Sequence, residues 1–295
     1  MNGRLLALVL VLSLIVITYV WQVTRAPVTL RVSTTTSLYA TGLLEELAKK
    51  FQERNPKVII EFIPVGSGEA LKKAESGDAD MVFVHAPNLE KKYLKKGVLK
   101  SGEIFAYNTF VILGPKDDPA RIRGMDPIKA MLAIYKAGET GSAKFVSRGD
   151  NSGTHNRELW LWSLAGRDPS GKDWYIESGS GMAQTLMIAN EYGAYTLSDI
   201  GTYLKLSSDL SYLTPLITQG SELLNVYSVY IVNSDVIKGA NERLAYKFQQ
   251  FVLSDEIQSF IGSYGVTEFG SPLFYPANGD PDGSLREAWN QLASG

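Results

Sequence analysis

The sequence of 295 residues contains no cysteine and only two histidines, His85 and His155. The absence of cysteine excludes disulfide bonds, thiolate zinc sites, a cysteine nucleophile and a lipid-modified N-terminal cysteine. Two histidines are too few for a histidine-rich metal centre, so we expect no metal site. Hydrophobic residues make up 45% of the chain, which is enough for a large core.

A strong excess of charge of either sign is also lacking. The chain carries 29 basic and 31 acidic residues, for a formal net charge of -2, and it has no long basic stretch. This balance argues against a nucleic-acid partner. The chain is longer than one typical domain of about 100–200 residues, so the length predicts two lobes.

One long apolar run is present, at the N-terminus. Residues 5–20 (LLALVLVLSLIVITYV), between Arg4 and Arg25, carry no charge. The run is short for a membrane span and long for the core of a signal peptide, and no clear small-x-small cleavage site precedes Val28. We interpret residues 1–27 as a signal segment that is either cleaved or kept as a membrane anchor. The rest of the chain is therefore expected to work outside the cytoplasm.

From Val28 onward, strand and helix patterns alternate. Alternating and continuous apolar runs predict strands at 28–34, 58–65 and 80–85, and helical spacing predicts helices at 39–54, after 66, and at 89–96. This order predicts an α/β fold with a parallel sheet and right-handed crossovers.

A second α/β stretch follows, with helices expected near 127–136, after 154 and at 182–192, and a strand at 143–147. Two strongly apolar strands, 109–115 and 226–233, flank it, and two helices follow at 241–253 and 254–264. We expect the chain to cross between lobes at the two flanking strands. The predicted division is an N-terminal segment (1–27), a discontinuous first lobe (28–113 with 226–295) and a second lobe (114–225).

Polar residues and glycines gather at three predicted strand-to-helix junctions, TTTS (34–37), GSG (66–68) and RGDNSGT (148–154). Each places hydroxyls and backbone N–H groups at the start of a helix, where the helix dipole favours negative charge. Taken singly, the hydroxyls suit ordinary N-caps, GSG suits a turn, and Arg148 with Asp150 suits a surface ion pair. Three such junctions in one two-lobed chain favour a ligand site.

Catalytic interpretations of these junctions are weaker. Asp150, Ser152 and His155 have the residue types of a hydrolytic triad, but they lie within six residues of one another and lack a nucleophile-elbow pattern. GSGEA lacks the Gly-Lys-Ser/Thr of a P-loop. A serine hydrolase with Ser152 as its nucleophile therefore stays a less favoured alternative.

The motifs TTTS, GSGEAL, VHAP (84–87) and SRGDNSGTH (147–155) occur in an order that resembles the substrate-binding proteins of tungstate ABC transporters. The similarity covers essentially the whole chain from Val28. It implies a type II periplasmic-binding-protein fold, two α/β lobes joined by a two-strand hinge, without catalytic activity or cofactor. It also implies an ABC transporter permease as partner. The ligand contacts it implies are Thr35, Thr36, Ser37, Ser67, Arg148, Ser152 and Thr154.

The residue types also bear on the choice of anion. Tungstate and molybdate are tetrahedral dianions without a proton at neutral pH, so a site made of donors alone suits them. Hydrogen phosphate favours a carboxylate acceptor, which in these motifs only Asp150 could supply, and sulfate is smaller than either metal oxyanion. The resemblance, not the residue types, ranks tungstate ahead of molybdate. A phosphate-binding or other oxyanion-binding protein and a signalling receptor ectodomain stay open, as do the roles of Asp150, Asn151 and His155.

Overall fold

The computed structural model describes residue 12 and residues 26–280 and 283–294. Nearly all of the predicted signal or anchor segment at 1–27 lies outside these residues. Within them, no helix is both long enough and apolar enough to cross a membrane.

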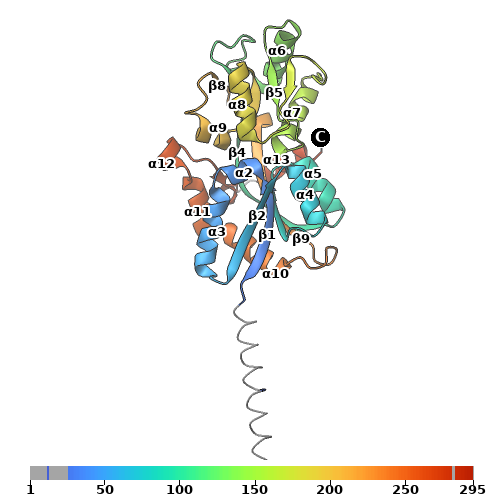
Figure 1. Cartoon of the computed structure of the whole chain (residues 1–295), viewed down its shortest axis with the longest axis vertical. Helices are drawn as coiled ribbons and strands as arrows, with labels where there is room; N and C mark the ends of the chain where they lie inside the picture. Colours follow the sequence, from blue (N-terminus) through green and yellow to red (C-terminus); the bar gives the residue numbers. More distant parts are fainter. Residues whose placement is uncertain (1–11, 13–25, 281–282, 295) are drawn as a thin grey trace, which may run out of the picture.

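Eight strands of the described chain form one mixed sheet (Figure 1). These eight are β1 (Val28–Thr35), β2 (Val58–Val65), β3 (Met81–Val84), β4 (Leu99–Pro115), β7 (Thr196–Asp199), β8 (Leu213–Ile217), β9 (Leu224–Val232) and β10 (Tyr275–Pro276); the two other strands are β5 (Phe145–Ser147) and β6 (Tyr175–Glu177). The predicted parallel arrangement is confirmed for β1, which lies between β2 and β3. The pairings of β3 with β9 and of β9 with β4 are antiparallel. β5 and β6 form a separate parallel pair.

The helices cover this sheet, and most of the predicted ones are confirmed. They are α2 (Thr36–Ala40), α3 (Leu43–Arg54), α4 (Ser67–Glu75), α5 (Pro87–Lys95), α6 (Pro127–Glu139), α7 (Gly153–Leu164), α8 (Met182–Tyr192), α9 (Ile200–Leu206), α10 (Glu242–Val252), α11 (Asp255–Ser263), α12 (Val266–Phe269) and α13 (Ser284–Leu292), with short 3₁₀ turns η1 (Ser221–Leu223) and η2 (Ala277–Gly279). The single helix predicted at 39–54 is wrong. Gly42 has φ +80°, which a right-handed helix does not allow, and it separates α2 from α3.

Strand β4 connects two sets of strands. Its first part, through Thr109, pairs with β9, whereas from Phe110 onward it pairs with β7 and β8. The predicted strand at 109–115 covers only the second part. The first part alternates between buried and exposed residues and contains two register shifts, so it shows no continuous apolar run.

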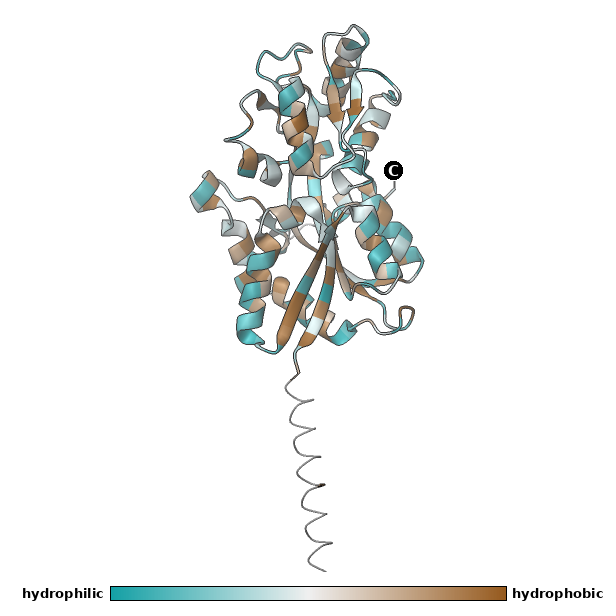
Figure 2. Ribbon diagram, in the orientation of Figure 1, coloured by the Kyte–Doolittle hydropathy of each residue, from teal (hydrophilic) through white to brown (hydrophobic). Residues whose placement is uncertain are grey.

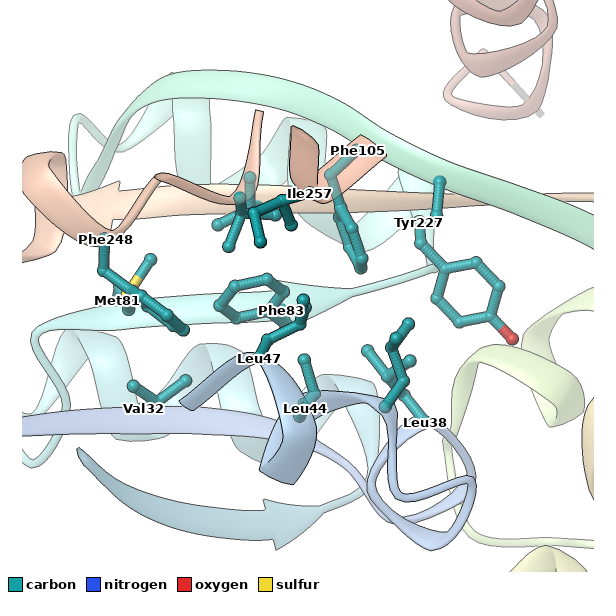
Figure 3. Packing of buried hydrophobic residues seen from close by; sticks show 14 of the residues in the cluster. Val32, Leu38, Leu44, Leu47, Met81, Phe83, Phe105, Tyr227, Phe248 and Ile257 are labelled. Atoms are coloured by element: carbon teal, nitrogen blue, oxygen red, sulfur yellow. The ribbon is translucent and has the colours of Figure 1, made fainter. Parts of the chain in front are cut away.

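Buried side chains fall into two groups that meet along β4. One group, here called the terminal half, uses residues up to Ala106 and from Val226 onward; its largest cluster packs Phe83, Phe105 and Phe248 between β1, β9 and α10 (Figure 3). The other group, here called the middle half, uses residues from Phe110 to Leu223. In Figure 1 the middle half forms the upper part of the molecule and the terminal half forms the lower part.

Most buried apolar residues of an element belong to the cluster of its own half. Strand β2 is largely hydrophobic, whereas β1 and α3 mix apolar and polar residues (Figure 2), and α3 buries only Leu43, Leu44, Leu47, Ala48 and Phe51. This one-sided pattern is typical of helices that pack on a sheet.

Candidate functional site

The three polar segments lie at strand-to-helix junctions, as predicted. TTTS joins β1 to α2, GSG follows β2 and opens α4, and the third segment joins β5 to α7. Thr35 Oγ1 accepts from Leu38 N (3.2 Å), and Ser152 Oγ accepts from His155 N (3.2 Å). The N-cap interpretation is therefore confirmed for both residues. Since each hydroxyl accepts in its cap, its own hydrogen stays available for another acceptor.

The three segments meet between the two halves. Arg148 Nη2 donates to Thr36 Oγ1 (3.3 Å), which links the third segment to the first. A Cβ on Gly66 would lie 3.4 Å from the carbonyl oxygen of Asp150, and one on Gly68 would lie 3.4 Å from that of Asn151. The glycines of the second segment therefore let it approach the 150–152 loop closely.

Several buried donors of these segments have no hydrogen-bond partner among the described residues. These atoms are the hydroxyl oxygens Thr34 Oγ1, Ser67 Oγ and Thr154 Oγ1 and the guanidinium nitrogens Arg148 Nε and Nη1. A buried donor without a partner costs about 1–3 kcal/mol, and more when it is charged. A ligand rich in acceptor atoms would remove this penalty. We call these five atoms, with the capping hydroxyls of Thr35 and Ser152, the donor cradle.

Arg148 is 2% exposed, so the surface ion-pair interpretation of Arg148 and Asp150 is wrong. Asp150 Oδ2 accepts from Arg148 Nη2 (2.5 Å), and its Oδ1 accepts from Ser152 N (3.1 Å). Both carboxylate oxygens are therefore engaged by the loop itself. The carboxylate orients the guanidinium and leaves Nε and Nη1 free for a ligand.

The remaining predicted contacts lie at the same place. Thr36 is partly exposed, and Ser37 is buried with its Oγ 3.5 Å from His85 Nε2. Burial lowers the pKa of His85 to about 4, so this ring is neutral at pH 7. The structure therefore brings all seven predicted residues to the boundary between the halves.

Sequence reasoning missed Thr34 as a donor and a fourth glycine-rich junction. Gly181 caps α8 without a side-chain hydrogen bond, and a Cβ there would lie 3.7 Å from Thr36 Oγ1. In the same loop, Ser178 Oγ donates to the carbonyl oxygen of Arg148 (3.3 Å). The run SGSG (178–181) before a predicted helix is the same signal as in the other segments and was available in the sequence.

The geometry does not assemble a hydrolytic site. His155 Nδ1 accepts from Asn151 N (3.0 Å), and Ser152 Oγ bonds the His155 backbone rather than its ring. No base in the described residues is thus positioned to take a proton from Ser152. The same residues contain no group of three His, Cys, Asp or Glu side chains that could hold a metal ion.

Comparison with known proteins agrees with this geometry. Residues 22–256 match the description "PBP superfamily domain". The tungstate-binding protein TupA of Peptoclostridium acidaminophilum is 37% identical over 253 residues, 86% of this chain and 87% of that protein. This chain belongs to the TupA family of the PBP superfamily.

Two solved structures of TupA-family proteins resemble this chain along most of its length. The tungstate-binding protein TupA of Desulfovibrio alaskensis G20 is 38% identical with a TM-score of 0.71, over 85% of this chain and 99% of that one. The tungstate ABC transporter protein of Geobacter sulfurreducens is 41% identical with a TM-score of 0.71, over 80% and 98%. The type II periplasmic-binding-protein fold is thereby confirmed.

Membership of the TupA family also decides between the classes of function left open by the sequence. The chain is a substrate-binding protein and not an enzyme, so the serine-hydrolase alternative is wrong. The expected extracytoplasmic location is confirmed as well. Anchoring by the N-terminal segment stays a prediction.

In this TupA-family chain the buried carboxyl group of Glu158 supports the loop that carries Arg148. Glu158 Oε2 accepts from Ser147 Oγ (2.6 Å), and its Oε1 accepts from Trp162 Nε1 (3.0 Å) and Tyr175 Oη (2.7 Å). Desolvation by burial raises the pKa of Glu158 to about 7, although the three donors oppose this shift. Ser147 directly precedes Arg148, so Glu158 fixes the strand end from which the guanidinium projects.

We expect Glu158→Gln to remove a pH dependence of the free energy of unfolding. The pKa of Glu158 is about 7 when folded and 4.5 in its ordinary state, so between these values the folded chain holds a proton that the unfolded chain has lost. Wild-type stability should therefore fall as pH rises through this window, by at most about 3 kcal/mol. The glutamine is neutral throughout, and its oxygen and amide can replace Oε1 and Oε2.

Urea unfolding of both proteins across the pH range from about 5 to 8 measures this difference. Glu53→Gln is the matched control, because Glu53 is exposed and its side chain makes no hydrogen bond in the described chain. A stability difference between wild type and Glu158→Gln that is constant with pH would contradict proton uptake by Glu158.

Proposed function

We propose that this chain captures tungstate, and also molybdate, between its two lobes and delivers the anion to an ABC transporter permease. The observation that carries the proposal is the donor cradle: three of its buried hydroxyls and two nitrogens of its guanidinium have no hydrogen-bond partner among the described residues. The names of the TupA relatives, which describe tungstate binding and a tungstate ABC transporter, support the ligand and the partner. We propose as ligand contacts Thr35, Thr36, Ser37, Ser67, Arg148, Ser152 and Thr154, with Thr34 in addition.

The arrangement of Asp150 favours a fully ionised oxyanion over hydrogen phosphate. A protonated anion needs an acceptor in the site, and Asp150 is the acidic side chain of the three segments. Its two oxygens bond Arg148 and the Ser152 backbone, so it faces its own loop. The cradle therefore offers donors to the ligand, which suits a tetrahedral dianion with four acceptor oxygens.

The two halves of the core supply the proposed clamp. The first and second segments belong to the terminal half, whereas Arg148, Ser152 and Thr154 belong to the middle half, so only a closed arrangement completes the donor set. We place the crossings between lobes near Thr109 and Leu224, within a few residues of the boundaries 113/114 and 225/226 predicted from the sequence.

We expect the uncharged run at 5–20 to keep the full-length chain on the membrane after export. The uncharged stretch between Arg4 and Arg25 has 20 residues, within the range of about 17–25 for a membrane span, and no clear cleavage site follows. Alkaline carbonate extraction of membranes from expressing cells tests this. The full chain should stay in the pellet, whereas a chain starting at residue 28 behind a cleavable signal should be released. Release of both chains would mean that the segment is removed.

We expect Arg148→Ala to weaken tungstate binding by about 2–5 kcal/mol, the range for breaking a buried hydrogen-bonded charge contact. Arg148→Lys keeps the charge but loses the planar fork that contacts two oxygens, so it should lose an intermediate amount. Isothermal titration measures both. Arg167→Ala is the control, because Arg167 is an exposed arginine of the same half. A loss of less than about tenfold for Arg148→Ala would remove this residue from the binding site.

We expect tungstate to compete best for the site, molybdate to follow closely, and sulfate and phosphate to bind weakly. The two metal oxyanions carry no proton and are larger than sulfate, so they suit a donor-only cavity of matching width. Competitive titration with all four anions at neutral pH gives the order. Phosphate or sulfate binding as tightly as tungstate would overturn the assignment.

A further inference from the structure

A cavity of about 270 Å³ lies between the two halves beside the donor cradle. It is lined by residues 85–88 of the terminal half, by one face of α7 and by α13; these residues are His85, Ala86, Pro87, Asn88, Gly153, Asn156, Arg157, Leu159, Trp160, Ser163 and Leu292. A Cβ on Gly153 would lie 2.7 Å from His85 Nε2. The His85 ring and the first turn of α7 therefore touch, and they form the wall between the cavity and the cradle.

The cavity contains a buried cation that forms no ion pair among the described residues. Arg157 is 5% exposed, and its Nη1 donates to the carbonyl oxygen of Glu222 (2.7 Å). Its guanidinium lies over the rings of Phe110 (5.3 Å) and Trp160 (5.1 Å). Among the described residues no carboxylate forms an ion pair with it, although the Glu222 carboxylate acts on it from a greater distance, and Nη1 is the guanidinium atom that forms a hydrogen bond there. Burial lowers the pKa of Arg157 to about 9, which still leaves it charged at neutral pH.

The rest of the lining is neutral or apolar. Asn88 and Asn156 contribute amides, with Asn88 Nδ2 3.4 Å from Asn156 Oδ1, and no acidic side chain lines the cavity. Pro87, Leu159 and Trp160 supply apolar walls. An inorganic oxyanion would find a single cation here and would leave these walls uncovered, whereas pockets that combine apolar walls with a few placed polar groups suit small organic ligands.

We propose that this cavity is a second ligand site, which takes a small organic carboxylate with an apolar body. The carboxylate accepts from Arg157 Nε and Nη2, which gives the guanidinium a direct ion-pair partner. The apolar body lies between Pro87 and the Trp160 ring. Since the lining comes from both halves, such a ligand favours the closed arrangement. The effect of this ligand on tungstate binding rests on the proposed function, whereas the binding of the ligand itself does not.

Benzoate is a suitable probe, because it combines one carboxylate with one apolar ring. Isothermal titration of the wild-type protein should show saturable binding of one benzoate per chain. Arg157→Gln should weaken this binding about tenfold or more, because it removes the charge. Ser163→Trp, at the exposed rim of the cavity, should block it by filling the space without removing any hydrogen bond of the described chain. Arg167→Gln, which changes an exposed arginine outside the cavity, should bind benzoate as the wild type does.

Arg148→Ala distinguishes this site from the donor cradle. It should keep benzoate binding while losing tungstate, and failure of tungstate to bind the wild-type protein would affect the proposed function alone. The proposal is overturned if the wild type shows no saturable benzoate binding, or if Arg148→Ala abolishes it. It is also overturned if Ser163→Trp, in folded form, binds benzoate as tightly as the wild type.

Discussion

Two buried asparagines lie where the chain passes between the terminal half and the middle half. Their hydrogen bond fixes the strand register on which the position of the donor cradle depends. Asn108 of β4 and Asn225 of β9 lie opposite one another, and Asn225 Nδ2 donates to Asn108 Oδ1 (2.9 Å). A shifted register would leave these amides buried without partners, at a cost of about 1–3 kcal/mol each. Asn225 Oδ1 also accepts a hydrogen bond from His85 Nδ1 (2.8 Å), and Nε2 of the neutral His85 ring lies near Ser37 Oγ. The crossing strands and the first ligand segment therefore share one buried network.

The hydroxyl residues of the donor cradle meet two opposite requirements at helix N-termini. An N-cap needs an acceptor for the first backbone N–H groups, whereas an anion needs donors. A hydroxyl satisfies both requirements, because its oxygen accepts in the cap and its hydrogen points elsewhere; an ionised aspartate at Thr35 or Ser152 would cap the helix but repel the ligand. Glycines 66 and 181 leave α4 and α8 without side-chain caps, so their N–H groups also stay available.

The sequence was most informative where its signals are local. The strands β1 and β2, the helices α4 and α7 and the three polar junctions could be predicted from apolar runs, glycines and hydroxyls that lie within a few residues of one another. The first part of β4 could not, because its partner β9 is more than a hundred residues away and register shifts break its pattern. His85 was not predicted as part of the site for the same reason: its role depends on Asn225, 140 residues along the chain.

Two buried arginines, Arg148 in the loop before α7 and Arg157 in α7, differ in whether a carboxylate pairs with them, and this difference bears on the ligand that each suits. Arg148 is compensated by Asp150, so the pair brings little net charge to the cradle. In the proposed function, hydroxyls, N–H groups and helix dipoles would therefore supply most of the attraction for a dianion. Such neutral donors are directional, and they discriminate between anions by the positions of their oxygens rather than by charge alone. Arg157, nine residues further along, forms no ion pair in the described chain and lies beside an apolar wall. A guanidinium with a carboxylate partner therefore suits an oxyanion surrounded by donors, while one without suits a ligand that brings its own carboxylate.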